Sequence, residues 1–289
     1  MQSSMELKRI QKRKNKNSLF HFLFLLSTCL GVLALVLLLG QVLLKAVGWI
    51  DWQFLTSFSS RLPERAGIKA AFVGTLWLMV ITAPLTVIIG VATAIYLEEY
   101  AKDNKLSRII QTNIANLAGV PSIVYGLLGL TVFVRLLHLE RSVLSGALTM
   151  TLLVLPIIIV ASQEAIRAIP MNQRHASYAL GATRWQTIVR VVLPSALPGI
   201  LTGAILSLSR AIGETAPLIV IGAVSYIAFL PHSIFDTFTV MPIQIYSWAS
   251  LPAKEFQNVA AAGIVVLLVM LLSMNALAIY LRNKYQKKN

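Results

Sequence analysis

Residues 19–44 read LFHFLFLLSTCLGVLALVLLLGQVLL and contain no Asp, Glu, Lys or Arg. A bilayer core of roughly 30 Å needs about 20 helical residues, so this stretch is long enough to cross a membrane. It is too long for an ordinary signal-peptide core, and no A-x-A cleavage pattern follows it. We therefore expect it to remain in the protein as a membrane anchor.

The rest of the chain repeats this pattern. The composition is 57% hydrophobic and only 12% charged, whereas a soluble domain carries about a quarter charged residues. Four more charge-free stretches follow along the chain: 70–97, 109–134, 142–163 and 256–281. One further apolar stretch, residues 195–222, is interrupted only by Arg210 and Glu214. We predict an all-α integral membrane protein with six transmembrane helices.

The distribution of positive charge predicts the orientation of the chain. The net charge is +14, but the basic residues gather at the two ends and in every second loop between the predicted spans. Such loops stay on the cytoplasmic side of a membrane. We therefore expect both termini in the cytoplasm, contact between the basic tail and membrane lipids, and no nucleic-acid partner. The basic segments are 1–18, 98–108, 164–194 and 282–289.

Several other functions find no support in the residues. Cys29 is the single cysteine, and the four histidines lack the spacing of metal ligands. No Gly-x-x-x-x-Gly-Lys-Ser/Thr sequence is present, so the chain has no P-loop to bind a nucleotide. We expect neither a metal nor a cofactor, and no catalytic residues.

The sequence SRAIGETAPLIVIGA, residues 209–223, places two charges inside an apolar stretch. Arg210 follows Ser195 by about 22 Å of helix, which brings it near the middle of the membrane. A charge at that depth costs at least about 2.5–3.5 kcal/mol and usually faces a cavity or a partner. Arg210 and Glu214 are one turn apart and can pair with each other, although this order is the less favourable one.

Pro217 favours a second interpretation of the same stretch. Because proline has no N–H, the carbonyl of Gly213 loses its helical partner, and broken backbone is tolerated in a membrane where it lines a cavity. A guanidinium, a carboxylate and a carbonyl then meet at one level. Since the fork of an arginine matches phosphate or carboxylate, we interpret Arg210 and Glu214 as part of an anion pathway, with a purely structural ion pair as the alternative.

Residues 116–130, NLAGVPSIVYGLLGL, combine polar and small residues within another apolar stretch. Glycines allow close helix packing, and Asn or Ser can form hydrogen bonds across the contact. Pro121 deprives the carbonyl of Leu117 of its donor, so a kink is expected. The alternative to simple packing is that this helix lines the pathway, with Asn116 and Ser122 contributing polar groups.

The segment 164–194 is the largest predicted feature outside the membrane. Residues 171–181 suit a short helix that ends at Gly181, and Thr183–Gln186 matches the capping box of a second helix. Trp185, Ile188, Val189 and Val192 would form one apolar face of that helix. We expect this apolar elbow either to rest on lipid headgroups or to dock into a groove on another protein.

Within this segment, HASYALGATRWQTIVRVVLP, residues 175–194, resembles the cytosolic loop signature of ABC-importer permeases, Glu-Ala-Ala-x-x-x-Gly followed by a hydrophobic-Leu-Pro ending. The chain differs from the signature by His175 in place of the glutamate and Ser177 in place of the second alanine. The resemblance implies the type I importer permease fold and a loop that binds a separate ATPase subunit. The implied coupling residues are Ala176, Gly181, Ala182, Leu193 and Pro194.

Residues 116–130, 209–223 and FTVMPIQIYSWA, 238–249, resemble the permeases of phosphate importers in particular. The resemblance implies ATP-driven phosphate import across the cytoplasmic membrane. Implied partners are a second homologous permease, two ATP-binding subunits and an external phosphate-binding protein. Import of sulfate or molybdate, secondary anion transport and a membrane scaffold stay as alternatives.

We therefore divide the chain into a basic cytosolic tail, an added first helix, a five-helix permease core that contains loop 164–194, and a second cytosolic tail. The four parts are 1–18, 19–44, 70–282 and 283–289.

Overall fold

The computed structural model describes residues 2–223 and 226–286 and is mostly helical. Over these residues the structure contains no β-strand; an isolated bridge joins Ser142 and Thr237. The predicted all-α architecture is confirmed. The α-helices are α1 (Gln2–Ala46), α2 (Trp52–Thr56), α3 (Lys69–Ile95), α4 (Lys105–Leu117), α5 (Ser122–Gly129), α6 (Val143–Arg167), α7 (Met171–Ala179), α8 (Arg184–Thr187), α9 (Leu193–Ile212), α10 (Ala216–Ile221), α11 (Met241–Ala249) and α12 (Lys254–Gln286).

Four shorter elements join or extend these helices. A 3₁₀ turn lies at Pro63–Arg65. Three further elements are π-helical turns. Tyr96–Tyr100 extends α3, Leu130–Leu136 extends α5, and Ile188–Val192 joins α8 to α9 without a break.

Five helical segments in the described part of the chain are long and apolar enough to cross a membrane: Lys16–Ala46, Lys69–Tyr100, Val143–Arg167, Arg184–Ile212 and Lys254–Lys284. The remaining predicted span, over residues 109–134, is a bent pair, Lys105–Leu117 and Ser122–Leu136, whose two halves meet at 103°. The sequence predicts a kink at Pro121, and the structure has a complete break there, with Pro121 capping α5. Six spans are obtained when this pair is counted as one.

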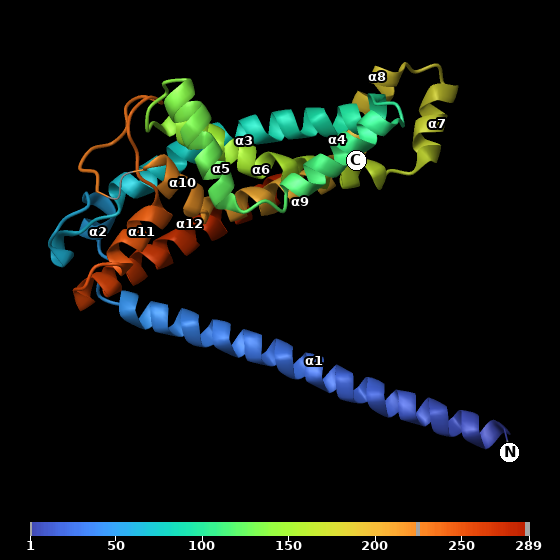
Figure 1. Cartoon of the computed structure of the whole chain (residues 1–289), viewed down its shortest axis with the longest axis horizontal. Helices are drawn as coiled ribbons and strands as arrows, with labels where there is room; N and C mark the ends of the chain where they lie inside the picture. The colour runs from blue at the N-terminus through green and yellow to red at the C-terminus, as the bar shows by residue number, and fades with distance from the viewer. Residues whose placement is uncertain (1, 224–225, 287–289) are drawn as a thin grey trace.

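The helices form an elongated bundle with a different structure at each end (Figure 1). α3 and α6 pack along each other at its centre, α7 and α8 lie at one end, and α2 and α11 lie at the other. α1 contacts α12 near Ala46 and then runs away from the bundle.

This placement of α1 leaves the apolar side chains of its membrane-spanning part exposed. The backbone of the predicted tail 1–18 continues α1 from Gln2 onward, and α12 extends to Gln286. Residue 1 and residues 287–289 of the two predicted tails lie outside the described part. The division of the chain into tails, added helix and core stays a prediction.

The segment after α10 closes over the helices rather than lying apart from them. In α11, Met241 and Trp248 are almost fully buried, and the ring of Trp248 lies 5.9 Å from that of Phe54. The N–H of Met241 donates to the hydroxyl of Thr75 on α3 at 3.0 Å. These contacts show that the segment packs into the bundle.

Small residues let the central helices approach closely. A Cβ added at Gly203 on α9 would lie 2.5 Å from Cβ of Ala161 on α6. A Cβ at Gly129 would lie 2.0 Å from Oγ1 of Thr149, also on α6. Helix association in a membrane depends on such close van der Waals packing, so these glycines determine how near α5 and α9 come to α6.

We expect Gly129→Val to destabilise the bundle by about 1–3 kcal/mol, the usual cost of overpacking a close contact. Thermal unfolding in detergent would show this as a lowered Tm. Gly31→Val is a matched control, because a Cβ at Gly31 on the exposed helix α1 meets nothing within 4 Å. Equal shifts of Tm for the two variants would contradict the assigned contact between α5 and α6.

Candidate functional site

A small pocket lies where α4, α5, α6 and α9 meet. Its lining includes Ser122, Arg210 and Glu214, together with Tyr125 and Ser207. The pocket therefore brings together three of the four predicted pathway residues, from two stretches of sequence that are about 90 residues apart. Asn116, the fourth, is exposed on α4 and does not line this pocket.

The charged pair lies at an interruption between two helices. The sequence predicts a span over 195–222 whose backbone is broken near Gly213, and in the structure α9 ends at Ile212 and α10 begins at Ala216. Pro217 stands in the first turn of α10, where its missing N–H is tolerated. Gly213 lies in the gap, and its carbonyl accepts from the hydroxyl of Thr215 at 3.4 Å. The interruption lies where Pro217 was expected to disturb the helix, and it is a full separation of two helices.

Arg210 and Glu214 form an ion pair across this interruption. Nε of Arg210 lies 3.4 Å from Oε1 of Glu214, and the Arg210 side chain is 68% exposed against 18% for Glu214. The two terminal guanidinium nitrogens have no protein partner among the residues that the structure describes. The pair that the spacing allows thus forms, but it leaves the fork of the arginine open.

The start of α5 forms another part of the pocket wall. Ser122 is the first residue of α5, whose N-terminal N–H groups form a region of positive potential. The hydroxyl of Tyr125 donates to the carbonyl of Leu117 at 2.8 Å, which supplies the partner that Pro121 removes. A helix start and an arginine fork on the same pocket are suited to an anion. The sequence analysis did not identify Tyr125.

The predicted elbow is present at the far end of the bundle. Gly181 ends the α7 turn with a φ of +81°, and Thr183 forms the predicted capping box with Gln186. Leu180 is 90% exposed beside this bend. Ala176 is exposed, Ala182 is half-buried in the bend, and Leu193 and Pro194 are half-buried in the first turn of α9.

The predicted apolar face of the second elbow helix is divided between buried and exposed side chains. Ile188 and Val192 are buried, but Trp185 and Val189 are exposed. A π-helical turn occupies Ile188–Val192, so the spacing of 3.6 residues per turn does not hold through this segment. Trp185 and Leu180 are left as an apolar surface beside the bend.

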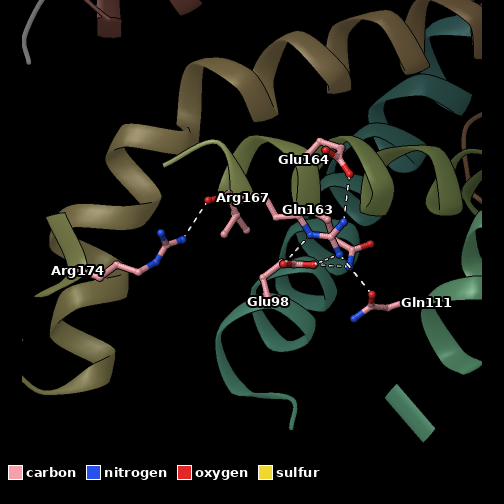
Figure 2. Close-up of polar contacts among 7 residues, drawn as sticks. Glu98, Gln111, Gln163, Glu164, Arg167 and Arg174 are labelled. Atoms are coloured by element: carbon pink, nitrogen blue, oxygen red, sulfur yellow. Dashed lines mark hydrogen bonds and ion pairs between the residues drawn. The ribbon is translucent and has the colours of Figure 1, made fainter. Parts of the chain in front are cut away.

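A polar cluster at the same end of the bundle was missed by the sequence analysis. Both carboxylate oxygens of Glu98 accept from Arg167, at 2.7 and 2.8 Å, and one also accepts from the amide of Gln163 at 2.7 Å (Figure 2). Arg167 also lies 3.2 Å from Glu164 and donates to Gln111 at 3.3 Å. The available signal was a pair of glutamates, Glu98 and Glu99, directly after an apolar span and facing loops rich in arginine.

The helical bundle and the bent span are features of a multi-pass membrane protein. A family model described as "Binding-protein-dependent transport system inner membrane component" matches residues 86–287. The chain belongs to this family. The resemblance to ABC-importer permeases inferred from residues 175–194 is thereby confirmed.

The chain is also similar in sequence to proteins that are named as permeases. The phosphate transport system permease protein PstA 1 of Mycobacterium tuberculosis (strain CDC 1551 / Oshkosh) is 36% identical over 272 residues, which cover 90% of this chain and 86% of that protein. A probable ABC transporter permease protein of Bacillus subtilis (strain 168), YqgI, is 33% identical over 241 residues, covering 82% and 81%. The similarity to phosphate-system permeases that the sequence predicts is confirmed.

Solved structures confirm the predicted permease fold. A bacterial ABC transporter involved in the import of alginate matches with a TM-score of 0.64 at 17% identity, covering 96% of this chain and 99% of that one. The MetNI methionine ABC transporter in an inward-facing conformation matches with a TM-score of 0.63 at 17% identity, covering 75% and 95%. At this identity the likeness concerns the fold alone.

Proposed function

We propose that the chain is a transmembrane permease subunit of an ATP-driven importer of inorganic phosphate. The observation that carries this proposal is the open guanidinium fork of Arg210 in a pocket between two interrupted helices. A planar fork can hold two oxygens of a tetrahedral anion. The similarity to phosphate transport system permeases supports phosphate as the anion.

Glu214 supports phosphate over a fully ionised oxyanion. Its carboxylate lines the same pocket as Arg210 and can accept a hydrogen bond from a protonated phosphate oxygen, which sulfate does not carry at neutral pH. It also holds one edge of the guanidinium and partly offsets its charge. A transported ion must be bound weakly enough to leave, so one arginine beside one carboxylate suits a pathway better than a group of cations.

The proposed function implies a set of partners. A second homologous permease (PstC-like) would cover the exposed side of Arg210, and two ATP-binding subunits (PstB-like) would dock on α7 and α8. A PstS-like phosphate-binding protein would deliver the anion at the end that carries α2 and α11. The bias of positive charge supports an orientation in which both termini and the α7–α8 end face the cytoplasm of a bacterial cell.

Purification tests the assignment as a non-catalytic subunit. We expect the isolated chain in detergent to hydrolyse no ATP, because it contains no P-loop. Coexpression with the proposed partners should give a complex that copurifies and hydrolyses ATP. ATP hydrolysis by the contaminant-free chain, or a stable complex that lacks an ATPase subunit, would contradict the proposal.

A further inference from the structure

We infer that three consecutive residues at the end of α3, Glu98, Glu99 and Tyr100, form a hub that couples the α7–α8 elbow to the membrane-spanning helices. Each of the three holds a different arginine: Arg167 at the end of α6, Arg174 in α7 and Arg184 at the start of α8. We name these six residues the α3 hub. The inference rests on the proposed function in one respect, namely that the coupling drives phosphate import. The contacts within the hub do not depend on that function.

The central contact of the hub is buried. The side chains of Arg174 and Glu99 are 9% and 7% exposed, and their closest atoms are 2.9 Å apart. The guanidinium of Arg174 also donates to the carbonyls of Ile169 at 2.7 Å and Ile166 at 3.0 Å. One side chain of α7 is thereby fixed both to α3 and to the end of α6, so α7 cannot shift without moving them or breaking these bonds.

The two outer contacts hold the helices on either side of α7. Glu98 binds Arg167 through both carboxylate oxygens, a bidentate arrangement that also fixes orientation. The guanidinium carbon of Arg184 lies 5.0 Å from the centre of the Tyr100 ring, within the range of a cation–π contact. Residues 98–100 therefore contact α6, α7 and α8 from one short segment of chain.

The backbone of this segment explains how three neighbouring residues reach three helices. Tyr96–Tyr100 is a π-helical turn, and such turns are rare and often occur at functional sites. It ends α3 directly, because Ala101 is already extended and its N–H closes the turn on the carbonyl of Tyr96. A displacement of α7 or α8 acts on this turn and is passed into α3, the helix that packs along α6 at the centre of the bundle.

The decisive experiment compares transport with ATP hydrolysis in the complete complex. Glu99→Gln removes the charge opposite Arg174 with little change of shape, and Tyr100→Leu removes the ring beneath Arg184. Asp103→Asn is the matched control, because Asp103 and its partner Arg108 are 89% and 77% exposed at the same end of the bundle. Phosphate uptake and ATP hydrolysis are measured in the same liposomes with the phosphate-binding protein.

We expect each hub variant to keep its ATPase subunits and to hydrolyse ATP, while phosphate uptake per ATP falls about tenfold, within the usual range of coupling between sites. The Asp103→Asn complex should match the wild type. Unchanged uptake per ATP in an intact complex would overturn the inference. Loss of the ATPase subunits with normal uptake per ATP in the complexes that remain would also overturn it, since the hub would then serve docking alone.

A distance measurement tests the hub without reference to the substrate. Nitroxide labels are placed by Lys102→Cys and Asn172→Cys, two exposed positions beside the hub and on α7, in a Cys29→Ala background. We expect one narrow distance distribution in the wild type that broadens in Glu99→Gln. Identical distributions would overturn the hub. If the distributions behave as expected but the wild-type complex imports no phosphate, the proposed function fails and the hub stands.

Discussion

Replacing Arg210 with Gln is expected to abolish phosphate uptake while protein level and complex assembly remain normal. The side chain is 68% exposed and makes one long contact, to Glu214, so the fold depends little on it. In the transport complex its fork would make two charge-assisted hydrogen bonds to the anion. Losing two bonds of about 1.5 kcal/mol each weakens the bound state by roughly 3 kcal/mol, or about a hundredfold.

Two further variants separate this role from a structural one. Arg210→Lys should restore only part of the uptake, because a point charge replaces a planar fork. If the charges served only to neutralise each other, the double variant Arg210→Leu with Glu214→Leu should be active, since an apolar pair can replace an ion pair. Uptake assays on membranes with matched expression decide the question, and recovery in the double variant would rule out the anion-binding role.

Gly181→Val should prevent recruitment of the ATPase subunits while the membrane helices still insert. Gly181 has a φ of +81°, and a Cβ there would meet nothing within 4 Å. The effect is therefore one of backbone conformation: a β-branched residue is strained at positive φ, by about 1–3 kcal/mol. We expect the bend between α7 and α8 to change and the surface around Leu180 and Trp185 to lose its shape.

Gly181→Asn is the matched control, because asparagine tolerates the left-handed conformation and fills the same open space. Copurification of the ATPase subunit with tagged chain measures both variants. Normal recruitment by Gly181→Val would show that the bend is not the docking element. Equal loss in both variants would indicate that the site cannot accept any side chain, which is contrary to the open surroundings of Gly181.

The sequence predicts those features that local rules determine. Charge-free stretches longer than the membrane is thick identify the spans. The capping box at Thr183 and the left-handed glycine at Gly181 depend on neighbours within a few residues, so both are correct in the structure. The pairing of Arg210 with Glu214 also follows from spacing alone.

Features that depend on packing of the whole bundle could not be predicted from these local rules. Pro121 predicts a kink, but the bend of 103° arises where α5 packs against α6 and α10. Gly126 illustrates how closely α5 packs against α10, since a Cβ at Gly126 would lie 2.7 Å from the backbone of Pro217. The α3 hub joins Glu99 to Arg174 across 75 positions of sequence, a separation at which no periodicity carries information. Asn116 was placed near the pathway by its sequence neighbours, but it is exposed on α4 and does not line the pocket.

Uptake by the reconstituted complex tests the central claim most directly. Liposomes that contain this chain, a homologous permease and the ATPase subunits are supplied with the binding protein, radiolabelled phosphate and internal ATP. The account predicts ATP-dependent accumulation of phosphate that a large excess of sulfate or molybdate does not reduce. Accumulation without ATP, or accumulation of sulfate at the same rate as phosphate, would contradict it.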